Sequence, residues 1–285
     1  MIARKPEWLR IKHRQTEQSR QVRAILKNLS LHTVCQEAKC PNIFECFGQK
    51  TATFMILGKH CTRHCRFCNI QKGKPDPVDQ QEPEHIVQAV RELGLKYVVI
   101  TSVTRDDLPD GGAEQFYQVI MALRKSLPDL KVEVLIPDFA GNQSALARVL
   151  EARPQVINHN VETVPRLYSD VRPEADFERS LSVLKQAKTL NPSMITKSGM
   201  MLGLGEREIE VHQAFQALID HDCSLLTLGQ YLAPSRDHYP IAEYIHPVQF
   251  HIYQKKAIQM GFLGVASAPL VRSSHHAMEL YEAVC

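Results

Sequence analysis

The chain has 285 residues, of which 44% are hydrophobic and 23% charged, as in a globular protein with a sizeable core in one large or two small domains. No run approaches the roughly 18 apolar residues of a membrane span, and the first 20 residues lack the apolar centre of a secretion signal. We therefore expect a cytoplasmic protein without a membrane partner, in which clustered cysteines bind metal or do chemistry.

The N-terminal segment concentrates the positive charge. Residues 1–29 carry eight Lys and Arg against two Glu, whereas the remainder carries 26 basic and 29 acidic residues. This basic arm indicates either an anionic partner or a solvated helix face, and the absence of interleaved aromatic residues argues against nucleic acid. Its basic residues are Arg4, Lys5, Arg10, Lys12, Arg14, Arg20, Arg23 and Lys27. Apolar residues at helical spacing predict a helix over 16–29.

From residue 51 onward, short β-like runs alternate with helical patterns. Six such units occupy about 210 residues, which favours a parallel sheet with crossover helices. Because a full barrel has eight units, we predict an α/β fold built as a partial (βα)6 TIM-like barrel, open on one side. Three regions are expected: an N-terminal helical and cysteine-rich extension (1–50), the barrel (51–262), and a C-terminal loop–helix tail (263–285). The predicted strands are 51–57, 97–101, 131–136, 155–160, 194–202 and 225–231.

Three cysteines follow the first predicted strand in the stretch CTRHCRFC. Cys61, Cys65 and Cys68 have the spacing C-x3-C-x2-C, and the ends of barrel strands are where active sites form. His60 or His64 could complete a four-ligand zinc site. A [4Fe–4S] cluster held by three thiolates would instead leave one iron open to a small molecule.

A second set of three cysteines lies upstream. Cys35, Cys40 and Cys46 have the spacing C-x4-C-x5-C and no fourth cysteine nearby. Cys223 leads into an apolar run and is expected in the core, and Cys285 is the last residue. The second set therefore binds a cluster with an open iron or takes an oxygen or nitrogen ligand.

The first cysteine set resembles the motif of the radical S-adenosylmethionine (SAM) superfamily, including the aromatic Phe67 before the last cysteine. The resemblance implies that the open iron binds SAM. It also implies that the reduced cluster breaks the sulfonium C–S bond to give a 5′-deoxyadenosyl radical, which abstracts hydrogen from unactivated carbon.

The two cysteine sets together resemble the paired signature of the lipoyl synthase family. Two positions depart from that family: His275 replaces a tyrosine in RSSY, and Thr104 replaces an acid in TSVD. The resemblance runs nearly end to end, through KPEWLR (5–10), CPNIFECF (40–47), GKHCTRHCRFCNI (58–70), RDDLPDGGAEQF (105–116), NHNVETVPRLY (158–168), VRPEADFERSL (171–181), TKSGMMLGLGE (196–206), LTLGQYLAPSRDHYP (226–240) and ASAPLVRSSHHA (266–277).

This resemblance implies a radical SAM sulfurtransferase with SAM and two [4Fe–4S] clusters. Such an enzyme inserts sulfur at carbons 6 and 8 of a protein-bound octanoyl-lysine, and draws both atoms from the auxiliary cluster. The family implies Ser274 as the fourth auxiliary ligand, with Ser273 as the fallback. Arg272 is expected near the auxiliary site, with a surface salt bridge as the alternative. Both serines could instead cap the final helix.

The SAM contacts are expected at strand ends. Phe67 and Asn69 flank the last cysteine and could meet the adenine, and Ser102 follows the second predicted strand. Asn160 and Glu162 could hold the ribose or the methionine part. Each of these residues could instead cap a strand end.

The resemblance implies octanoylated carriers as partners: the glycine-cleavage H protein and the acyltransferase subunits of 2-oxo-acid dehydrogenases. It also implies an electron donor such as ferredoxin or flavodoxin, and we expect a monomer. Two alternative hypotheses remain. One is an iron–sulfur electron-transfer or zinc-binding module without radical chemistry, and the other is a different radical SAM enzyme that inserts sulfur. Two three-thiolate sets fit ferredoxins poorly. Biotin synthases lack the upstream set, and methylthiotransferases carry extra domains.

Overall fold

The computed structural model describes residues 5–11 and 15–285, and the chain forms two compact units. The first-half unit comprises residues 15–63 and 69–157 of the described chain, and the second-half unit comprises residues 5–11, 64–68 and 158–285. The division into regions 1–50, 51–262 and 263–285 stays a prediction.

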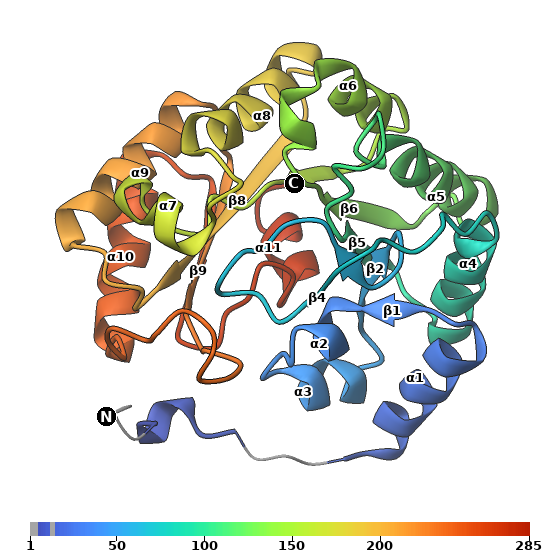
Figure 1. The fold of residues 1–285 in the computed structure, drawn as a ribbon, viewed down its shortest axis with the longest axis horizontal. Helices are drawn as coiled ribbons and strands as arrows, with labels where there is room; N and C mark the ends of the chain where they lie inside the picture. Colours follow the sequence, from blue (N-terminus) through green and yellow to red (C-terminus); the bar gives the residue numbers. More distant parts are fainter. Residues whose placement is uncertain (1–4, 12–14) are drawn as a thin grey trace. The chain divides into compact units, whose positions relative to one another are not determined.

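In the first-half unit, helices α4, α5 and α6 run along one side of strands β2, β5 and β6 (Figure 1). The strand order is β1-β2-β5-β6-β7. β1 is antiparallel to β2, whereas β5 is parallel to both β2 and β6. The elements are α1 (Glu17–Asn28), β1 (His32–Thr33), α2 (Val34–Glu37), α3 (Ile43–Gly48), β2 (Thr53–Ile56), β3 (His60–Cys61), β4 (Gln71–Lys72), α4 (Glu82–Leu93), β5 (Tyr97–Ser102), α5 (Ala113–Ser126), β6 (Lys131–Leu135), η2 (Phe139–Gly141), α6 (Gln143–Glu151) and β7 (Val156–Asn158).

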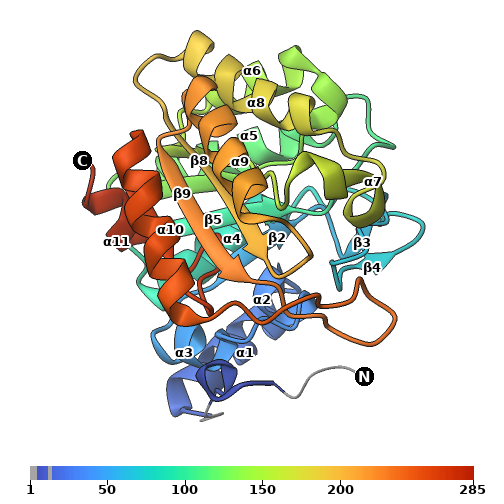
Figure 2. The same cartoon turned by 90° about the vertical axis from the view of Figure 1, so that its left-hand side faces the viewer.

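In the second-half unit, helices α9 and α10 lie beside strands β8 and β9 (Figure 2). β8, β9 and β10 form a parallel series, with Gly199 paired to Thr227 and Gly264 paired to Leu225. The elements are η1 (Glu7–Leu9), η3 (Pro165–Leu167), α7 (Tyr168–Val171), α8 (Phe177–Leu190), β8 (Ile195–Leu202), α9 (Glu208–Asp220), β9 (Leu225–Gln230), α10 (Pro247–Met260), β10 (Gly264–Ser267) and α11 (Ala277–Glu282).

The helices form where the apolar spacing predicted them. α1 begins at Thr16, whose side chain accepts a hydrogen bond from the Ser19 N–H, and its buried stripe includes Val22, Ile25 and Leu26. In the second-half unit, edge-to-face rings of Phe215, Tyr253 and Phe262 pack at the centre of the apolar core.

All six predicted strands are present, and the α/β fold with a mostly parallel, open sheet is confirmed. Two features of the structure were not predicted. The cysteine-rich segment contains the short helices α2 and α3, whereas a helix was predicted only over 16–29. The tail is not only a loop and a helix, because Gly264–Ser267 adds the parallel strand β10. No described helix has the length and apolar character that crossing a membrane would require.

Candidate functional site

Cys61 lies at the end of β3, shortly after β2. The backbone between the two strands turns through left-handed residues, with φ of +69° at Leu57 and +86° at Gly58. A side chain at Gly58 would meet the Asp76 carboxylate at 2.6 Å, so only glycine fits there. The Cys61 Sγ accepts a hydrogen bond from the Thr104 N–H at 3.4 Å. Cys61, Cys65 and Cys68 are each partly exposed, so all three thiols are accessible to an incoming cluster.

Two carboxylates fix the approach to Cys61. Asp76 accepts from the Lys59 N–H at 3.1 Å and contacts His60 Nδ1 at 2.9 Å, and the Lys59 bond is the main reason its pKa is lowered. Both oxygens of Glu82 lie 3.2 Å from the Leu57 N–H. Burial raises the pKa of Glu82 to about 7, although hydrogen bonds from Gln115 and Leu57 favour its charged form.

Residues 64–68 are held within the second-half unit. The Arg66 N–H donates to the Val171 carbonyl, and the Arg66 carbonyl accepts from the Tyr239 N–H, each at 2.9 Å. The Arg66 guanidinium lies 5.2 Å from the centre of the Tyr239 ring. Phe67 packs against the apolar core. A contact of Phe67 with adenine stays a prediction.

The upstream cysteines form a second group within the first-half unit. Cys35 lies on α2, Cys46 on α3 and Cys40 between them, where its N–H donates to the Cys35 carbonyl at 3.0 Å. Burial and then the neighbouring thiols raise the pKa of Cys35 to about 11 and that of Cys46 to about 12. Three converging thiols whose ionisation is opposed by burial and mutual repulsion fit a cationic metal cluster, which would neutralise the thiolates.

Asn69 contacts this cysteine-rich segment. Its Nδ2 donates to the Glu37 carbonyl, directly after α2, at 2.6 Å. The amide nitrogen is thus used within the protein, and the predicted contact of Asn69 with adenine is left to the rest of the side chain. The bond connects the residue that follows Cys68 to the segment that carries Cys35 and Cys40.

Ser102 ends β5 and carries a buried hydroxyl. Its Oγ has no hydrogen-bond partner among the described residues. Leaving a buried hydroxyl unpaired costs about 1–3 kcal/mol. A polar group of a bound ligand would remove this cost, so the position fits the predicted SAM contact.

Asn160 and Glu162 follow β7 and contact each other. Asn160 Nδ2 donates to Glu162 Oε1 at 3.1 Å. Glu162 has a left-handed φ of +65°, an uncommon conformation for this residue type. Burial raises its pKa, opposed by the nearby charges of Arg172 and Arg272 and by the Asn160 bond. This carboxyl therefore feels the charge of two guanidinium groups, and it belongs to a strained, half-buried turn.

Ser273 of the RSS motif is bonded to two asparagines of the second-half unit. The Ser273 hydroxyl accepts from Asn158 Nδ2 at 2.7 Å and donates to Asn160 Oδ1 at 3.0 Å. Neither serine is the N-cap of α11, because His276 occupies that position. The helix-capping alternative is therefore wrong, and Ser273 instead connects the motif to Asn158 and Asn160 within the second-half unit.

Arg272 lies over the end of β9. Its Nη1 donates to the Val271 carbonyl at 2.6 Å, and a side chain on Gly229 would meet that carbonyl at 2.0 Å. The pKa of Lys5 is lowered, first by partial burial and then by repulsion from the Arg272 charge. Arg272 thus sits where the chain backbone of the motif closely approaches the sheet.

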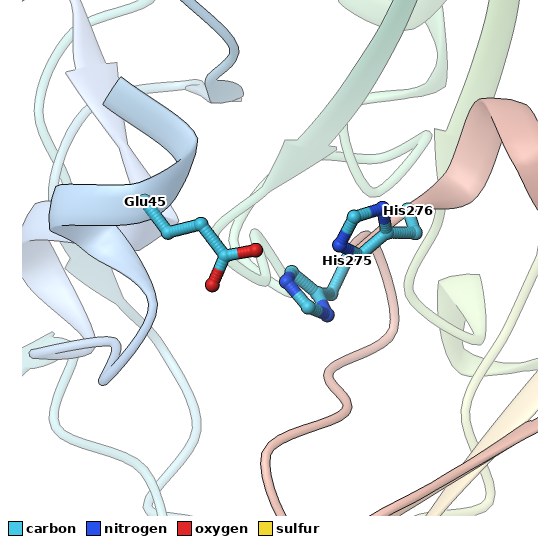
Figure 3. Close-up of side chains that lie close together, drawn as sticks. All are labelled: Glu45, His275 and His276. Carbon is cyan, nitrogen blue, oxygen red and sulfur yellow. The ribbon is translucent and has the colours of Figure 1, made fainter. Parts of the chain in front are cut away.

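His275, one of the two departures from the family pattern, packs against His276. The two rings lie edge to face with centres 4.1 Å apart, and His276 Nδ1 lies 2.5 Å from Glu279 Oε2. Figure 3 draws both imidazoles, with His276 next to α11, together with Glu45 of α3. His64 was considered above as a possible zinc ligand. Its Nδ1 lies 3.0 Å from Glu174 Oε1.

The described basic residues of the arm have different surroundings. Arg23 lies over the rings of Phe44 and Phe47, and Arg10 lies 3.8 Å from Glu7. Arg20 and Lys27 are exposed on α1. Arg4, Lys12 and Arg14 lie outside the described residues. The prediction for Cys223 is confirmed, since it is buried in the apolar core, and Cys285 is exposed.

Several residues that contact the predicted site residues were not predicted from the sequence. The buried Arg63, two residues after Cys61, pairs with the exposed Asp106 and the buried Asp138, and Arg172 donates to the Asn160 carbonyl. The stretch RDDLPD carries a signal, since two adjacent acids after a strand are available to pair with a cation, but spacing alone does not name the partner.

Comparisons with known proteins agree with this arrangement. Residues 55–218 match the family model of the Radical SAM superfamily. The crystal structure of methylornithine synthase (PylB) covers 89% of this chain and 75% of its own with a TM-score of 0.57 and 13% identity, which shows the shared fold. Fold, family match and three-cysteine loop define a radical SAM enzyme.

Full-length relatives narrow the class. The chain is 57% identical over 279 residues to the lipoyl synthase of Caldicellulosiruptor saccharolyticus, covering 98% of both chains. It is 56% identical over 277 residues to the lipoyl synthase of Caldanaerobacter subterraneus, covering 97% of both. The chain belongs to the lipoyl synthase family, whose enzymes use SAM and [4Fe–4S] clusters.

Proposed function

We propose that this enzyme inserts two sulfur atoms into a protein-bound octanoyl-lysine, at carbons 6 and 8, to form the lipoyl group. The observation that carries the proposal is the second group of thiols, Cys35, Cys40 and Cys46, which converge in addition to the radical SAM motif. Electron transfer alone gives no reason for two sets that each lack a fourth cysteine.

Cys61, Cys65 and Cys68 would hold one cluster, and Cys35, Cys40, Cys46 and Ser274 the other. When bound, the first cluster and SAM supply a radical able to take hydrogen from unactivated carbon, and the auxiliary cluster supplies sulfur. The protein's own part is to place these groups and the octanoyl chain, because no acid–base side chain could break such C–H bonds.

Ser274 is favoured over Ser273 as the auxiliary ligand. The Ser273 hydroxyl is already engaged with Asn158 and Asn160, and coordination of iron as an alkoxide would remove the proton that it donates to Asn160 Oδ1. An alkoxide ligand is less usual for iron than a thiolate, which suits a cluster that is consumed. Arg272, directly before this pair, would balance cluster charge or contact the substrate backbone.

The SAM contacts are proposed for Ser102, Asn160 and Glu162, with Phe67 and Asn69 next to the last cysteine. The unpaired Ser102 hydroxyl supports a polar contact. The charges of Arg172 and Arg272 favour the ionised form of Glu162, which supports its role as an acceptor for the ribose hydroxyls or the amino group of SAM.

Octanoylated carrier proteins are the proposed partners, namely the glycine-cleavage H protein and acyltransferase subunits of 2-oxo-acid dehydrogenases. A ferredoxin or flavodoxin would supply electrons to a cytoplasmic monomer. The basic arm would raise the association rate with an acidic carrier, an effect that salt screens within about 8 Å at physiological ionic strength.

The test is anaerobic incubation with an octanoyl-lysine peptide, SAM and dithionite, followed by mass analysis for two added sulfur atoms. Replacing Cys35, Cys40 and Cys46 together by alanine should leave SAM cleavage intact and abolish sulfur insertion. Replacing Cys61, Cys65 and Cys68 should abolish both and halve the iron, from about eight to about four per chain.

Cys285→Ser is the matched control, because Cys285 is exposed and belongs to neither set. It should retain the iron content and both activities. Lipoyl product from the variant without Cys35, Cys40 and Cys46 would show that these residues do not hold the sulfur source.

A further inference from the structure

Arg63 lies within the radical SAM motif, two residues after Cys61, and it is buried rather than solvated. The residue is 5% exposed. Its Nε and Nη2 donate to the two oxygens of Asp106 at 2.8 and 2.9 Å, and Nη2 also donates to Asp138 Oδ1 at 2.6 Å. Asp106 follows β5 and Asp138 follows β6, so one guanidinium connects the cysteine loop to two strand ends.

Thr62 strengthens the same connection. Its N–H and hydroxyl both donate to the Thr104 carbonyl, at 3.1 and 3.0 Å, and its Oγ1 accepts from the Asp106 N–H at 3.1 Å. The loop after β5 in turn supplies the Thr104 N–H that donates to Cys61 Sγ. The two residues after Cys61 therefore share one set of hydrogen bonds with the segment that contacts its sulfur.

Asp138 accepts hydrogen bonds from Arg63 and from a strained turn. It accepts from the Ala140 N–H at 3.0 Å, where Phe139, Ala140 and Gly141 have φ of +47°, +51° and +83°. Consecutive left-handed residues that are not glycine persist only where surrounding contacts hold them. Arg63 and the Ala140 N–H share the same Asp138 oxygen, so the turn and the cysteine loop depend on each other.

We propose that Arg63 is a positioning residue that holds Cys61 at its cluster-binding place through the fork to Asp106 and Asp138. A planar guanidinium can bond both oxygens of Asp106 as a fork and still donate to Asp138, whereas an ammonium lacks this fork geometry. The positive charge of Arg63 is balanced by Asp106 and Asp138. Arg63 therefore acts through the geometry of the loop and not by screening the charge of a cluster. The proposal rests on the proposed function for what Cys61 binds, whereas the positioning itself belongs to the chain alone.

The test compares Arg63→Met with Arg66→Met, which removes an exposed cation from the same loop. Hydrogen–deuterium exchange is measured on metal-free, full-length protein over peptides covering residues 59–66. We expect the Thr62 N–H to exchange at least about tenfold faster in Arg63→Met, because opening no longer breaks charge-assisted bonds. Arg66→Met should leave the Thr62 exchange rate within about twofold of the unmodified chain.

Asp106→Asn serves as the milder variant, because Arg63→Met removes the ion pair of the buried Asp138 and could prevent folding. It keeps the Asp138 bond, and we expect acceleration at Thr62 of about threefold or more. After anaerobic reconstitution, both Arg63→Met and Asp106→Asn should lower SAM cleavage while retaining the iron of the auxiliary cysteines.

Unchanged exchange at Thr62 in Asp106→Asn, or equal acceleration in Arg66→Met, would overturn the proposal. If the unmodified enzyme made no lipoyl product, the exchange experiment would still decide whether Arg63 positions the loop. The two failures are therefore distinguishable.

Discussion

Ser273→Ala separates the structural serine of the RSS motif from the proposed ligand. The substitution removes one oxygen that accepts from Asn158 Nδ2 at 2.7 Å and donates to Asn160 Oδ1 at 3.0 Å. Asn158 is fully buried, so water cannot readily replace the lost acceptor. The variant should therefore lose stability before it loses chemistry.

The magnitude follows from these two bonds. Each neutral hydrogen bond contributes about 1 kcal/mol, and leaving a buried amide donor without this acceptor adds a desolvation cost of similar size. The expected loss is about 2–3 kcal/mol in the free energy of unfolding. For a chain somewhat larger than 250 residues, this corresponds to a decrease in Tm of roughly 4–8 °C.

The assay is thermal unfolding of the metal-free chain, paired with sulfur insertion measured well below the Tm. Ser273→Ala should show the lower Tm, normal iron content after reconstitution and only a mild loss of product. Ser274→Cys should form the auxiliary cluster but yield sulfur poorly, because a thiolate is a stronger iron–sulfur ligand than an alkoxide.

The reasoning would be refuted by an unchanged Tm in Ser273→Ala together with a larger loss of sulfur insertion than in Ser274→Cys. That pair of results would make Ser273 the iron ligand. It would also mean that the bonds to Asn158 and Asn160 contribute little to the fold.

Three further predictions concern other parts of the site. Gly229→Ala should displace the RSS loop and lower both Tm and sulfur insertion, because its Cβ would meet the Val271 carbonyl at 2.0 Å; Gly48→Ala, with no neighbour closer than 3.6 Å, is the control and should be neutral or stabilising. Ser102→Ala should raise the KM for SAM without lowering the Tm of the metal-free chain, since its hydroxyl has no partner among the described residues; a lower Tm with an unchanged KM would contradict a ligand contact. The pKa of Glu82 is raised from 4.5 to about 7, so the folded state retains a proton that the unfolded state loses, and stability should fall by up to about 3 kcal/mol between pH 4.5 and 7. Glu82→Gln should flatten this part of the urea-denaturation pH profile, and an unchanged slope would assign the decline to another group.

The fold followed from local patterns wherever those patterns were strong. Runs such as YVVIT and KVEVL are rich in β-branched residues, and they form β5 and β6 as predicted. β10 was missed because GVAS begins with glycine and carries one β-branched residue; its pairing to β9 supplies the stability that its composition does not. The short helices α2 and α3 were missed because four and six residues give no helical period to detect.

The site was predictable where chemistry lies in close spacing and not where it lies in tertiary contacts. The six site cysteines could be identified from their spacings, C-x3-C-x2-C and C-x4-C-x5-C. The pairing of Arg63 with Asp106 and Asp138 spans 43 and 75 residues, and no local pattern encodes it. The use of the Asn69 amide by the Glu37 carbonyl is equally invisible in sequence, because a backbone acceptor has no residue identity.

Thr104 reaches the cysteine loop through its backbone. Its N–H donates to Cys61 Sγ, and its carbonyl accepts twice from Thr62. Contacts made by the peptide group survive when the side chain changes, so this position can drift from acid to threonine while the sulfur keeps its hydrogen bond. A motif search that requires an acid after TSV would reject this chain because of the side chain at position 104. The hydrogen bonds to Cys61 and Thr62 do not involve that side chain. Homologues with other residues at this position should therefore be retained as candidates whenever both cysteine sets are intact.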